Sequence, residues 1–191
     1  LEYYNKNADN FAKTTINVDF YETQNRFSTL LPEHGYILDF GCGSGRDTKY
    51  FLEQGFYVDA TDGSEEMCHI ASNYTGIQVR RLLFEELDEN KKYDGIWACS
   101  SILHLPKNEL KAVFMKMFKA LKEDGIIYTS FKYGDFEGER NGRYFTDFTE
   151  KTFEEFVVEI DNLQLKEEWI TGDVRPGRGE EKWLNVILQK N

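Results

Sequence analysis

Apolar positions follow a helical period in some segments of the chain and form short continuous runs in others. The clearest helical period lies within residues 107–122. Its apolar stripe consists of Leu110, Val113, Phe114, Met117, Phe118 and Leu121. Asp124-Gly125 is expected to end this helix. By contrast, the apolar run at residues 36–40 leads directly into glycines, which predicts a buried strand.

Period, segment length and flanking Gly or Pro predict the other elements in the same way. Helices are expected over about 2–14, 17–31, 45–54, 64–74, 107–122 and 149–160. Strands are expected over about 36–40, 56–61, 78–83, 93–99, 126–131, 163–171 and 182–189. Strands that alternate with helices predict an α/β fold with a doubly wound, mostly parallel seven-stranded sheet. The last two strands lack a helix between them, so they are expected to form an antiparallel pair at one edge.

The chain lacks an internal repeat and a low-complexity linker, which predicts a single domain over residues 1–191. Within it we expect a helical lid at 1–34 and a cofactor-binding core at 35–132. Two connections, 133–148 and 172–181, are expected as loops on the face formed by the carboxyl ends of the strands. The first is unusually long for an ordinary connection.

Composition and charge narrow the function classes. Hydrophobic residues make up 40% of the 191 residues, which is enough for a packed core. Lys and Arg number 23 against 34 Asp and Glu, a net charge of −11 that disfavours a nucleic-acid partner and suits a small acceptor or a protein. Three cysteines without framework spacing indicate a reducing compartment. Without an apolar run of membrane-spanning length or a signal-peptide pattern at Leu1–Asn5, a cytoplasmic protein is expected; the oligomeric state stays open.

The end of the first expected strand carries a glycine turn, Gly41-x-Gly43-x-Gly45. Ligands of open α/β sheets bind beyond the carboxyl ends of the strands. Glycines allow turns closed to other residues and a close approach of a ligand to the main chain, and the next helix offers unpaired N–H groups. Taken alone, such a turn also occurs for purely structural reasons.

An acidic residue follows at the end of the second expected strand. Asp62 lies 17 residues after Gly45, close to the spacing of about 20 expected for a carboxylate that binds ribose hydroxyls. Asp62 also precedes Gly63, and Asp-Gly is a common turn pair. One residue can serve both purposes.

Four segments together resemble the class I S-adenosylmethionine-dependent methyltransferases. They are Ile37-Leu38-Asp39-Phe40-Gly41-Cys42-Gly43-Ser44-Gly45-Arg46, Tyr93-Asp94-Gly95-Ile96-Trp97-Ala98-Cys99, Ile102-Leu103-His104-Leu105-Pro106 and Leu121-Lys122-Glu123-Asp124-Gly125-Ile126-Ile127. The third glycine of the turn falls two residues after the second, whereas the dinucleotide fingerprint needs three. The resemblance spans about residues 35–132 and implies a Rossmann-like fold with S-adenosylmethionine as cofactor.

The resemblance also implies roles for single residues. Gly41, Cys42, Gly43, Ser44 and Gly45 would hold the methionine part of the cofactor. Asp39 would position the turn or meet the cofactor's amino group, and Cys99 would offer its main-chain carbonyl to that group. Asp62 would bind the ribose, with Gly63, Ser64 and Met67 beside the adenine. Arg46 would either pair with the cofactor's carboxylate or remain a solvated residue of the first helical turn.

One departure from the family concerns the adenine. The family often places an acid after the third strand, but this chain reads Leu82-Leu83-Phe84-Glu85. We therefore expect Leu83 and Phe84 to hold the adenine by apolar contacts and the main chain.

His104 is the candidate general base, because it follows the fourth strand near the expected methyl position. A base is needed only if the acceptor must lose a proton; otherwise His104 orders its loop. His34 and His69 are interpreted as structural. The spacing of His, Cys and carboxylates does not predict a metal site.

The acceptor is expected to meet residues outside the shared core. Tyr133, Arg140, Arg143, Arg175 and Arg178 lie in the two long connections, and the arginines could bind an anionic small molecule. Alternatively they pair with nearby acids and only order the loops; the expected partners are Asp135, Glu137, Glu139, Glu180 and Glu181. Tyr3, Tyr4 and Phe11 form a lid over the cofactor or simply pack the N-terminal helix. Tyr4 is also a candidate to bind the acceptor.

The sequence therefore predicts a methyltransferase for a small acceptor, with methyl transfer by in-line displacement. Three alternatives remain open: a cofactor-binding sensor or scaffold without methyl transfer, a nicotinamide-dependent oxidoreductase, and a methyltransferase for a protein or a nucleic acid.

Overall fold

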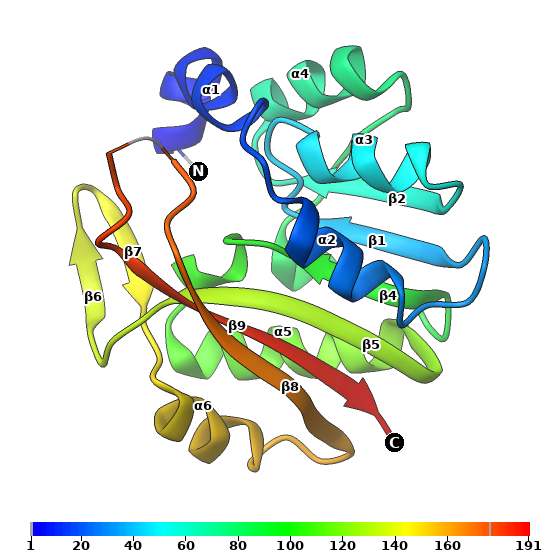
Figure 1. The fold of residues 1–191 in the computed structure, drawn as a ribbon, viewed down its shortest axis with the longest axis vertical. Helices are drawn as coiled ribbons and strands as arrows, with labels where there is room; N and C mark the ends of the chain where they lie inside the picture. Colours follow the sequence, from blue (N-terminus) through cyan, green and yellow to red (C-terminus); the bar gives the residue numbers. More distant parts are fainter. Residues whose placement is uncertain (1, 176) are drawn as a thin grey trace.

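The computed structural model describes residues 2–175 and 177–191, with side-chain environments from residue 4 onward. Its centre is the expected seven-stranded sheet (Figure 1). In spatial order the strands are β3 (Arg80–Arg81), β2 (Tyr57–Asp62), β1 (Tyr36–Phe40), β4 (Tyr93–Ala98), β5 (Leu121–Lys132), β9 (Lys182–Lys190) and β8 (Leu163–Gly172). The first five pair in parallel, and β9 runs antiparallel to both β5 and β8. The predicted fold class is confirmed.

Helices cover both faces of the sheet, as a doubly wound fold requires (Figure 1). On one face lie α2 (Tyr21–Ser28), α3 (Arg46–Glu53) and α4 (Glu65–Thr75); on the other lie α5 (Lys107–Ala120) and α6 (Glu150–Val157). The apolar stripe of α5 is buried against the sheet, with Leu110, Phe114 and Met117 fully inaccessible. Each such side chain contributes about 1.5–3 kcal/mol by leaving water.

The two faces have different cores. Phe27 of α2 and Phe51 of α3 surround Trp97, whose ring stacks on Tyr128 with centroids 4.0 Å apart. On the opposite face, Phe148 and other residues near α6 join the stripe of α5. Because both faces are filled, ligand access is left to the edge where the parallel strands end.

The chain between β5 and α6 differs from the expected irregular loop. Within 133–148 it forms a two-stranded hairpin, β6 (Glu137–Arg140) and β7 (Arg143–Thr146). The turn between them is Asn141-Gly142, with φ of 51° and 73°, which is typical of the tightest hairpin connection. Thr146 Oγ1 donates to the Leu105 carbonyl at 2.7 Å, so the hairpin is anchored beside the segment after β4.

Several boundaries also differ from expectation. The third strand spans only Arg80–Arg81 instead of 78–83, and a short 3₁₀ turn, η1 (Phe84–Glu86), follows it. The fifth strand begins at Leu121, directly after α5, because Leu121 already pairs with Tyr93 before a register shift. The second helix is shorter than 17–31.

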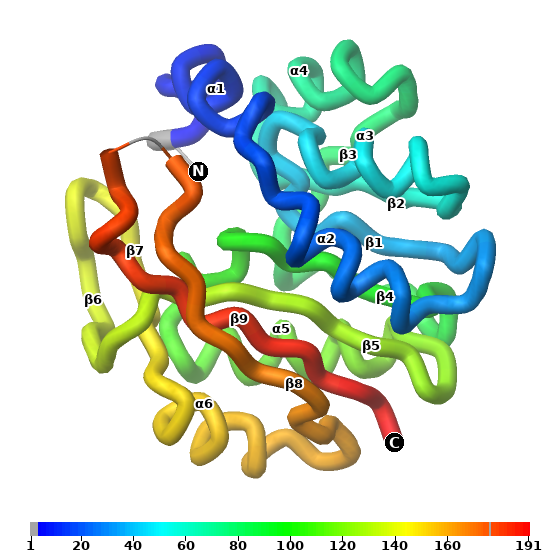
Figure 2. Tube along the Cα trace, in the orientation of Figure 1, coloured from blue at the N-terminus to red at the C-terminus, as the bar shows by residue number. Residues whose placement is uncertain are grey.

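The N-terminal helix α1 (Glu2–Thr15) lies against α4 at the edge where the strands end (Figure 2). Asn5 Oδ1 accepts a 2.6 Å hydrogen bond from Ser64 Oγ, and Thr15 Oγ1 donates to Ser44 Oγ at 3.2 Å. These bonds place α1 over the glycine turn. Among the described residues, none of the helices is long and apolar enough to span a membrane.

Candidate functional site

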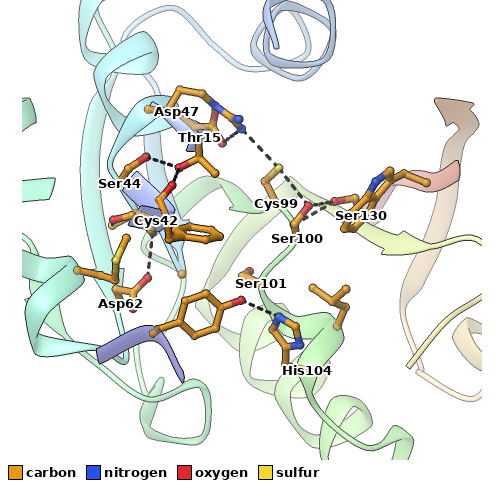
Figure 3. Close-up of a pocket in the computed structure, with 18 of the residues that line it drawn as sticks. Thr15, Cys42, Ser44, Asp47, Asp62, Cys99, Ser100, Ser101, His104 and Ser130 are labelled. Atoms are coloured by element: carbon orange, nitrogen blue, oxygen red, sulfur yellow. Dashed lines mark hydrogen bonds and ion pairs between the residues drawn. The ribbon is translucent and has the colours of Figure 1, made fainter. Parts of the chain in front are cut away.

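A cavity of about 390 Å³ opens where β1, β2, β4 and β5 end, beneath α1 (Figure 3). Its volume lies in the range usual for sites that bind small molecules. The wall is built from the glycine turn, the ends of β2 and β4, the segment after β3, the hairpin and the β8–β9 connection. Segments that are distant in the sequence therefore share one site, as expected for the carboxyl-end edge of an α/β sheet.

The glycine turn is fixed by main-chain bonds to the end of β2. The N–H groups of Gly41 and Cys42 both donate to the Thr61 carbonyl at 2.9 Å. Gly41, Cys42, Gly43 and Ser44 all line the cavity. A Cβ at Gly43 would project between Phe11 and Met67, 3.4 Å and 3.9 Å from their nearest atoms, so its absence leaves main chain exposed to a ligand.

Gly45 has a different role from the other two glycines. It is the N-cap of α3 with φ of 83°, and it does not line the cavity. A Cβ there would lie 2.7 Å from Thr75 Cγ2 and 3.2 Å from Ala71 Cβ. Gly45 therefore permits close packing of α3 on α4.

Asp62 points into the cavity from the end of β2 (Figure 3). Its Oδ2 accepts from the N–H of Gly43 and its Oδ1 from the N–H of Ser64, both at 2.9 Å. Burial raises the pKa of Asp62 above its ordinary value, and the main-chain donors partly oppose that shift. Both uses expected from the sequence are thus compatible, since Asp62 orders its turn and presents acceptor oxygens to the cavity.

Asp39 does not line the cavity, although the sequence suggested a contact with the cofactor. It is buried, and Thr48 Oγ1 donates to its Oδ2 at 2.5 Å. Burial and then the charge of Asp47 raise its pKa. Of the two roles expected for Asp39, the structure favours positioning of the turn.

Arg46 is occupied by its neighbour in the sequence. Its Nε and Nη2 donate to the two oxygens of Asp47 at 2.8 Å and 2.9 Å, and its guanidinium lies 4.7 Å from the ring centre of Phe20. Asp47 also accepts from Gln24 and Trp97 at 2.7 Å and 2.8 Å. Burial alone would raise the pKa of Asp47, but the charge and hydrogen bonds of Arg46 lower it. Arg46 is therefore neither solvated nor a lone cation, yet it still lines the cavity.

The end of the cavity near β3 is mainly apolar. Gly63, Met67, Leu83 and Phe84 line it, as expected. Ser64 lies just behind and caps α4 by accepting from the N–H of Met67 at 3.3 Å. Because the Leu83 N–H already donates to the Glu86 side chain at 2.8 Å, its main chain offers less to a ligand than expected. Glu85, which the sequence analysis passed over, also lines this end.

The middle of the cavity is formed by the residues after β4. Cys99 lines it as expected, and burial raises the pKa of its thiol to about 12, so it stays protonated. Ser100 has φ of 51°, and its N–H donates to Ser130 Oγ at 2.9 Å. Ser101 Oγ donates to the Phe40 carbonyl at 2.7 Å. This segment therefore ties the ends of β1, β4 and β5 together.

His104 faces the cavity from the short turn η2 (Ile102–His104). Its Nδ1 lies 2.7 Å from the Tyr144 carbonyl, and its Nε2 lies 2.8 Å from the hydroxyl of Tyr4 (Figure 3). The ring packs edge-on against Phe145, with centroids 4.7 Å apart. Burial lowers the pKa of His104 to about 4, so the ring is neutral at physiological pH.

Of the six residues expected to meet the acceptor, four line the cavity and two do not. Tyr4, Arg143, Arg175 and Arg178 line the cavity. Arg140 lies outside it, bound to both oxygens of Asp147 at 2.6 Å and 2.8 Å, and exposed Tyr133 donates to Glu150 at 2.8 Å. The side chain of Tyr3 and all of Pro176 lie outside the described residues.

Arg175 and Arg178 are also paired with acids. Arg175 binds both oxygens of Asp173, and Arg178 lies 3.9 Å from Glu181. Of these two acids, only Glu181 was among the partners expected from the sequence.

Other cavity residues were not anticipated. They include Asp47, Ser101, Ser130, Lys132, Trp183 and Asn185. Asn185 could have been singled out from the sequence, because this polar residue interrupts the apolar run of its strand; in the structure it is buried. Its Oδ1 accepts from the Tyr128 hydroxyl at 2.8 Å. Within the described part of the chain, His, Cys and carboxylate side chains form no group that could hold a metal ion.

Comparison with known proteins finds similarity to methyltransferases. The family model described as a methyltransferase domain matches residues 37–125, which contain the glycine turn, Asp62 and His104. Residues 37–125 are therefore similar to a methyltransferase domain, as the resemblance of the glycine turn to class I S-adenosylmethionine-dependent methyltransferases implied.

Similar methyltransferases come from several bacteria. A Bacillus subtilis protein that carries the name of a methyltransferase, YqeM, is 34% identical over 116 residues, which are 55% of this chain and 47% of that protein. The chain thus spans about half the length of this relative. An uncharacterized methyltransferase of Staphylococcus carnosus is 24% identical over 165 residues, covering 83% of this chain and 79% of its own.

Among solved methyltransferases, one enzyme of Burkholderia thailandensis matches all of this chain and 84% of its own, with a TM-score of 0.78 and 24% identity. It is 1,6-didemethyltoxoflavin-N1-methyltransferase, solved with 1,6-didemethyltoxoflavin and S-adenosylhomocysteine. At 24% identity, this similarity shows that the two proteins share a fold.

Proposed function

We propose that the chain transfers a methyl group from S-adenosylmethionine to a small, anionic acceptor. The observation that carries the proposal is a single cavity with two unlike ends. One end has the glycine turn, Asp62 and apolar side chains; the other has aromatic rings and cationic groups. A two-substrate transfer needs both ligands side by side and shielded from water.

The first end fits the cofactor's chemistry. Asp62 offers carboxylate oxygens for ribose hydroxyls, and the main chain at Gly43 is uncovered. Met67, Leu83 and Phe84 provide apolar contacts for the adenine, and Glu85 adds an acceptor for its amino group. When bound, the cofactor supplies a methyl group already activated on a sulfonium, so the chain mainly has to align the reactants.

The second end favours a negative acceptor. Lys132, Arg143, Arg175 and Arg178 line it, against the two acids Asp173 and Glu181 that pair with them. These cations gather at one end of the cavity on a protein of net charge −11. These four cationic side chains therefore favour an anionic acceptor at this end of the cavity.

The kind of acceptor follows from size and charge. α1 and the hairpin contribute to the cavity wall, and the volume of about 390 Å³ lies in the range of small-molecule sites. The Burkholderia thailandensis enzyme, which has a similar fold, was solved with the small molecule 1,6-didemethyltoxoflavin bound. A polyanionic nucleic acid would meet the acidic remainder of the surface.

The proposal is tested by thermal unfolding with S-adenosylhomocysteine or NAD as ligand. S-adenosylhomocysteine is expected to raise the Tm with concentration, as mass action requires, while NAD leaves it unchanged. Asp62→Asn should weaken S-adenosylhomocysteine binding by about 1–3 kcal/mol, because hydrogen bonds to an ionised carboxylate are lost. Asp161→Asn, an exposed substitution away from the cavity, is the matched control. Stabilisation by NAD instead of S-adenosylhomocysteine would refute the proposal.

A further inference from the structure

The hydrogen bonds of His104 fix which of its ring nitrogens carries the proton. A main-chain carbonyl only accepts, so the 2.7 Å contact with Tyr144 O requires a proton on Nδ1. In the neutral ring Nε2 then has a free electron pair, and the Tyr4 hydroxyl at 2.8 Å must donate to it. Burial keeps the ring neutral by lowering its pKa to about 4.

Tyr4 is held on its other side by a cation. Arg143 Nη1 lies 3.4 Å from the Tyr4 hydroxyl oxygen, so the guanidinium donates toward the oxygen whose proton points at His104. A positive charge there favours a developing negative charge on the phenol. The Tyr4 ring packs edge-on against Phe11 at 5.3 Å, which fixes its direction.

All three side chains line the cavity, and they come from different elements. Tyr4 belongs to α1, His104 to η2 and Arg143 to β7. The dashed line that ends at His104 in Figure 3 marks the hydrogen bond from the Tyr4 phenol. The site is therefore complete only when α1 covers it.

We propose that Tyr4 is a catalytic residue that takes the proton of the methyl acceptor while passing its own proton to His104 Nε2. This inference rests on the proposed function. The acceptor atom uses its electron pair to bond the methyl carbon, and the carbon–sulfur bond breaks with its pair left on sulfur. The acceptor's proton moves to Tyr4, and the Tyr4 proton moves to His104, which becomes an imidazolium bonded to Tyr144 O.

The relay defines the acceptor class more narrowly. A proton-accepting pair serves an O–H or N–H nucleophile, which must lose a proton on methylation. An acceptor without such a proton, for example a thioether or a tertiary amine, would not need a proton relay. Combined with the cationic lining, this points to an anionic molecule that carries a hydroxyl or N–H group at the methylated position.

The first test reads the proton positions by ¹⁵N NMR of the imidazole rings in the complex with S-adenosylhomocysteine. His104, assigned with His104→Gln, should be neutral with its proton on Nδ1. Tyr4→Phe removes the donor but keeps the ring, so it should move the Nε2 resonance of His104. Tyr57→Phe, at an exposed position of β2, should leave it unchanged. A proton on Nε2, or an Nε2 resonance that ignores Tyr4→Phe, would overturn the relay.

The second test measures S-adenosylhomocysteine release from S-adenosylmethionine in a deproteinised metabolite extract. Tyr4→Phe and His104→Gln should each lower the rate by about 10²- to 10⁴-fold, the usual contribution of proton transfer. The double variant should be no slower than the worse single one, because the two groups act in one chain. A Tyr4→Phe rate equal to that of Tyr57→Phe would refute a catalytic role.

The two proposals fail in different ways. If calorimetry finds no binding of S-adenosylhomocysteine to the unaltered chain, the proposed function fails. If that ligand binds the chain and Tyr4→Phe equally well but the NMR or rate result is negative, only the relay fails.

Discussion

At the scale of single residues, each glycine of the turn is explained by what lies next to it. Gly43 leaves main chain open between Phe11 and Met67, whereas the missing side chain of Gly45 makes room for Thr75 and Ala71 of α4. A glycine-rich motif therefore combines two physical requirements. Only one of them concerns a ligand, and the other concerns how closely two helices pack.

Gly45→Ala is expected to cost stability rather than ligand contacts. The left-handed backbone would cost about 1–2 kcal/mol, and the clash with Thr75 would add about 1–3 kcal/mol. Gly142→Ala is the matched control, since Gly142 has a similar φ of 73° but nothing within 4 Å of its Cβ position. Urea unfolding should show the larger loss for Gly45→Ala; equal losses would contradict a packing role.

Residues with a local signal could be predicted from the sequence, and residues defined by tertiary pairing could not. The turn glycines and His104 stand at strand ends, which the apolar pattern already marks. Asp47 resembles any acid in a first helical turn, and only the fold brings Arg46, Gln24 and Trp97 to it. The pairing of Arg140 with Asp147 likewise depends on the hairpin.

At the scale of elements, the sheet was predictable and the additions to it were less so. Alternating strands and helices leave few topologies, so the parallel core and the final antiparallel pair followed from pattern alone. The β6–β7 hairpin was missed because its strands carry few apolar residues, although Asn141-Gly142 is a strong hairpin signal. The short third strand was overestimated because only two residues pair with β2.

The N-terminal helix is the element whose behaviour should change on ligand binding. α1 reaches the cavity through Tyr4 and Phe11 and is tied to the core by Asn5 and Thr15. Saturating S-adenosylhomocysteine should therefore slow amide hydrogen exchange in α1, because a ligand beneath it disfavours local opening. The exposed side of α5, away from the cavity, serves as the internal control. Unchanged exchange in α1 at saturation would contradict a lid role.

At the scale of the whole molecule, charge and topology act together. The sheet brings the ends of its parallel strands to one edge, and α1, the hairpin and the β8–β9 connection enclose that edge. The proposed acceptor end of the cavity carries four cationic side chains in a chain whose net charge is −11. This arrangement supports the proposal that the molecule holds an activated methyl donor beside a small anion and away from water.

The most direct measurement of this central claim follows the methyl group itself. The chain is incubated with S-adenosylmethionine labelled in its methyl group and a deproteinised metabolite extract. The label should appear in small molecules retained by an anion exchanger, with one S-adenosylhomocysteine formed per methyl group transferred, and Asp62→Asn should slow its appearance at limiting donor. Transfer of the label only in parallel incubations with protein or nucleic acid in place of the extract, or no S-adenosylhomocysteine at all, would contradict it.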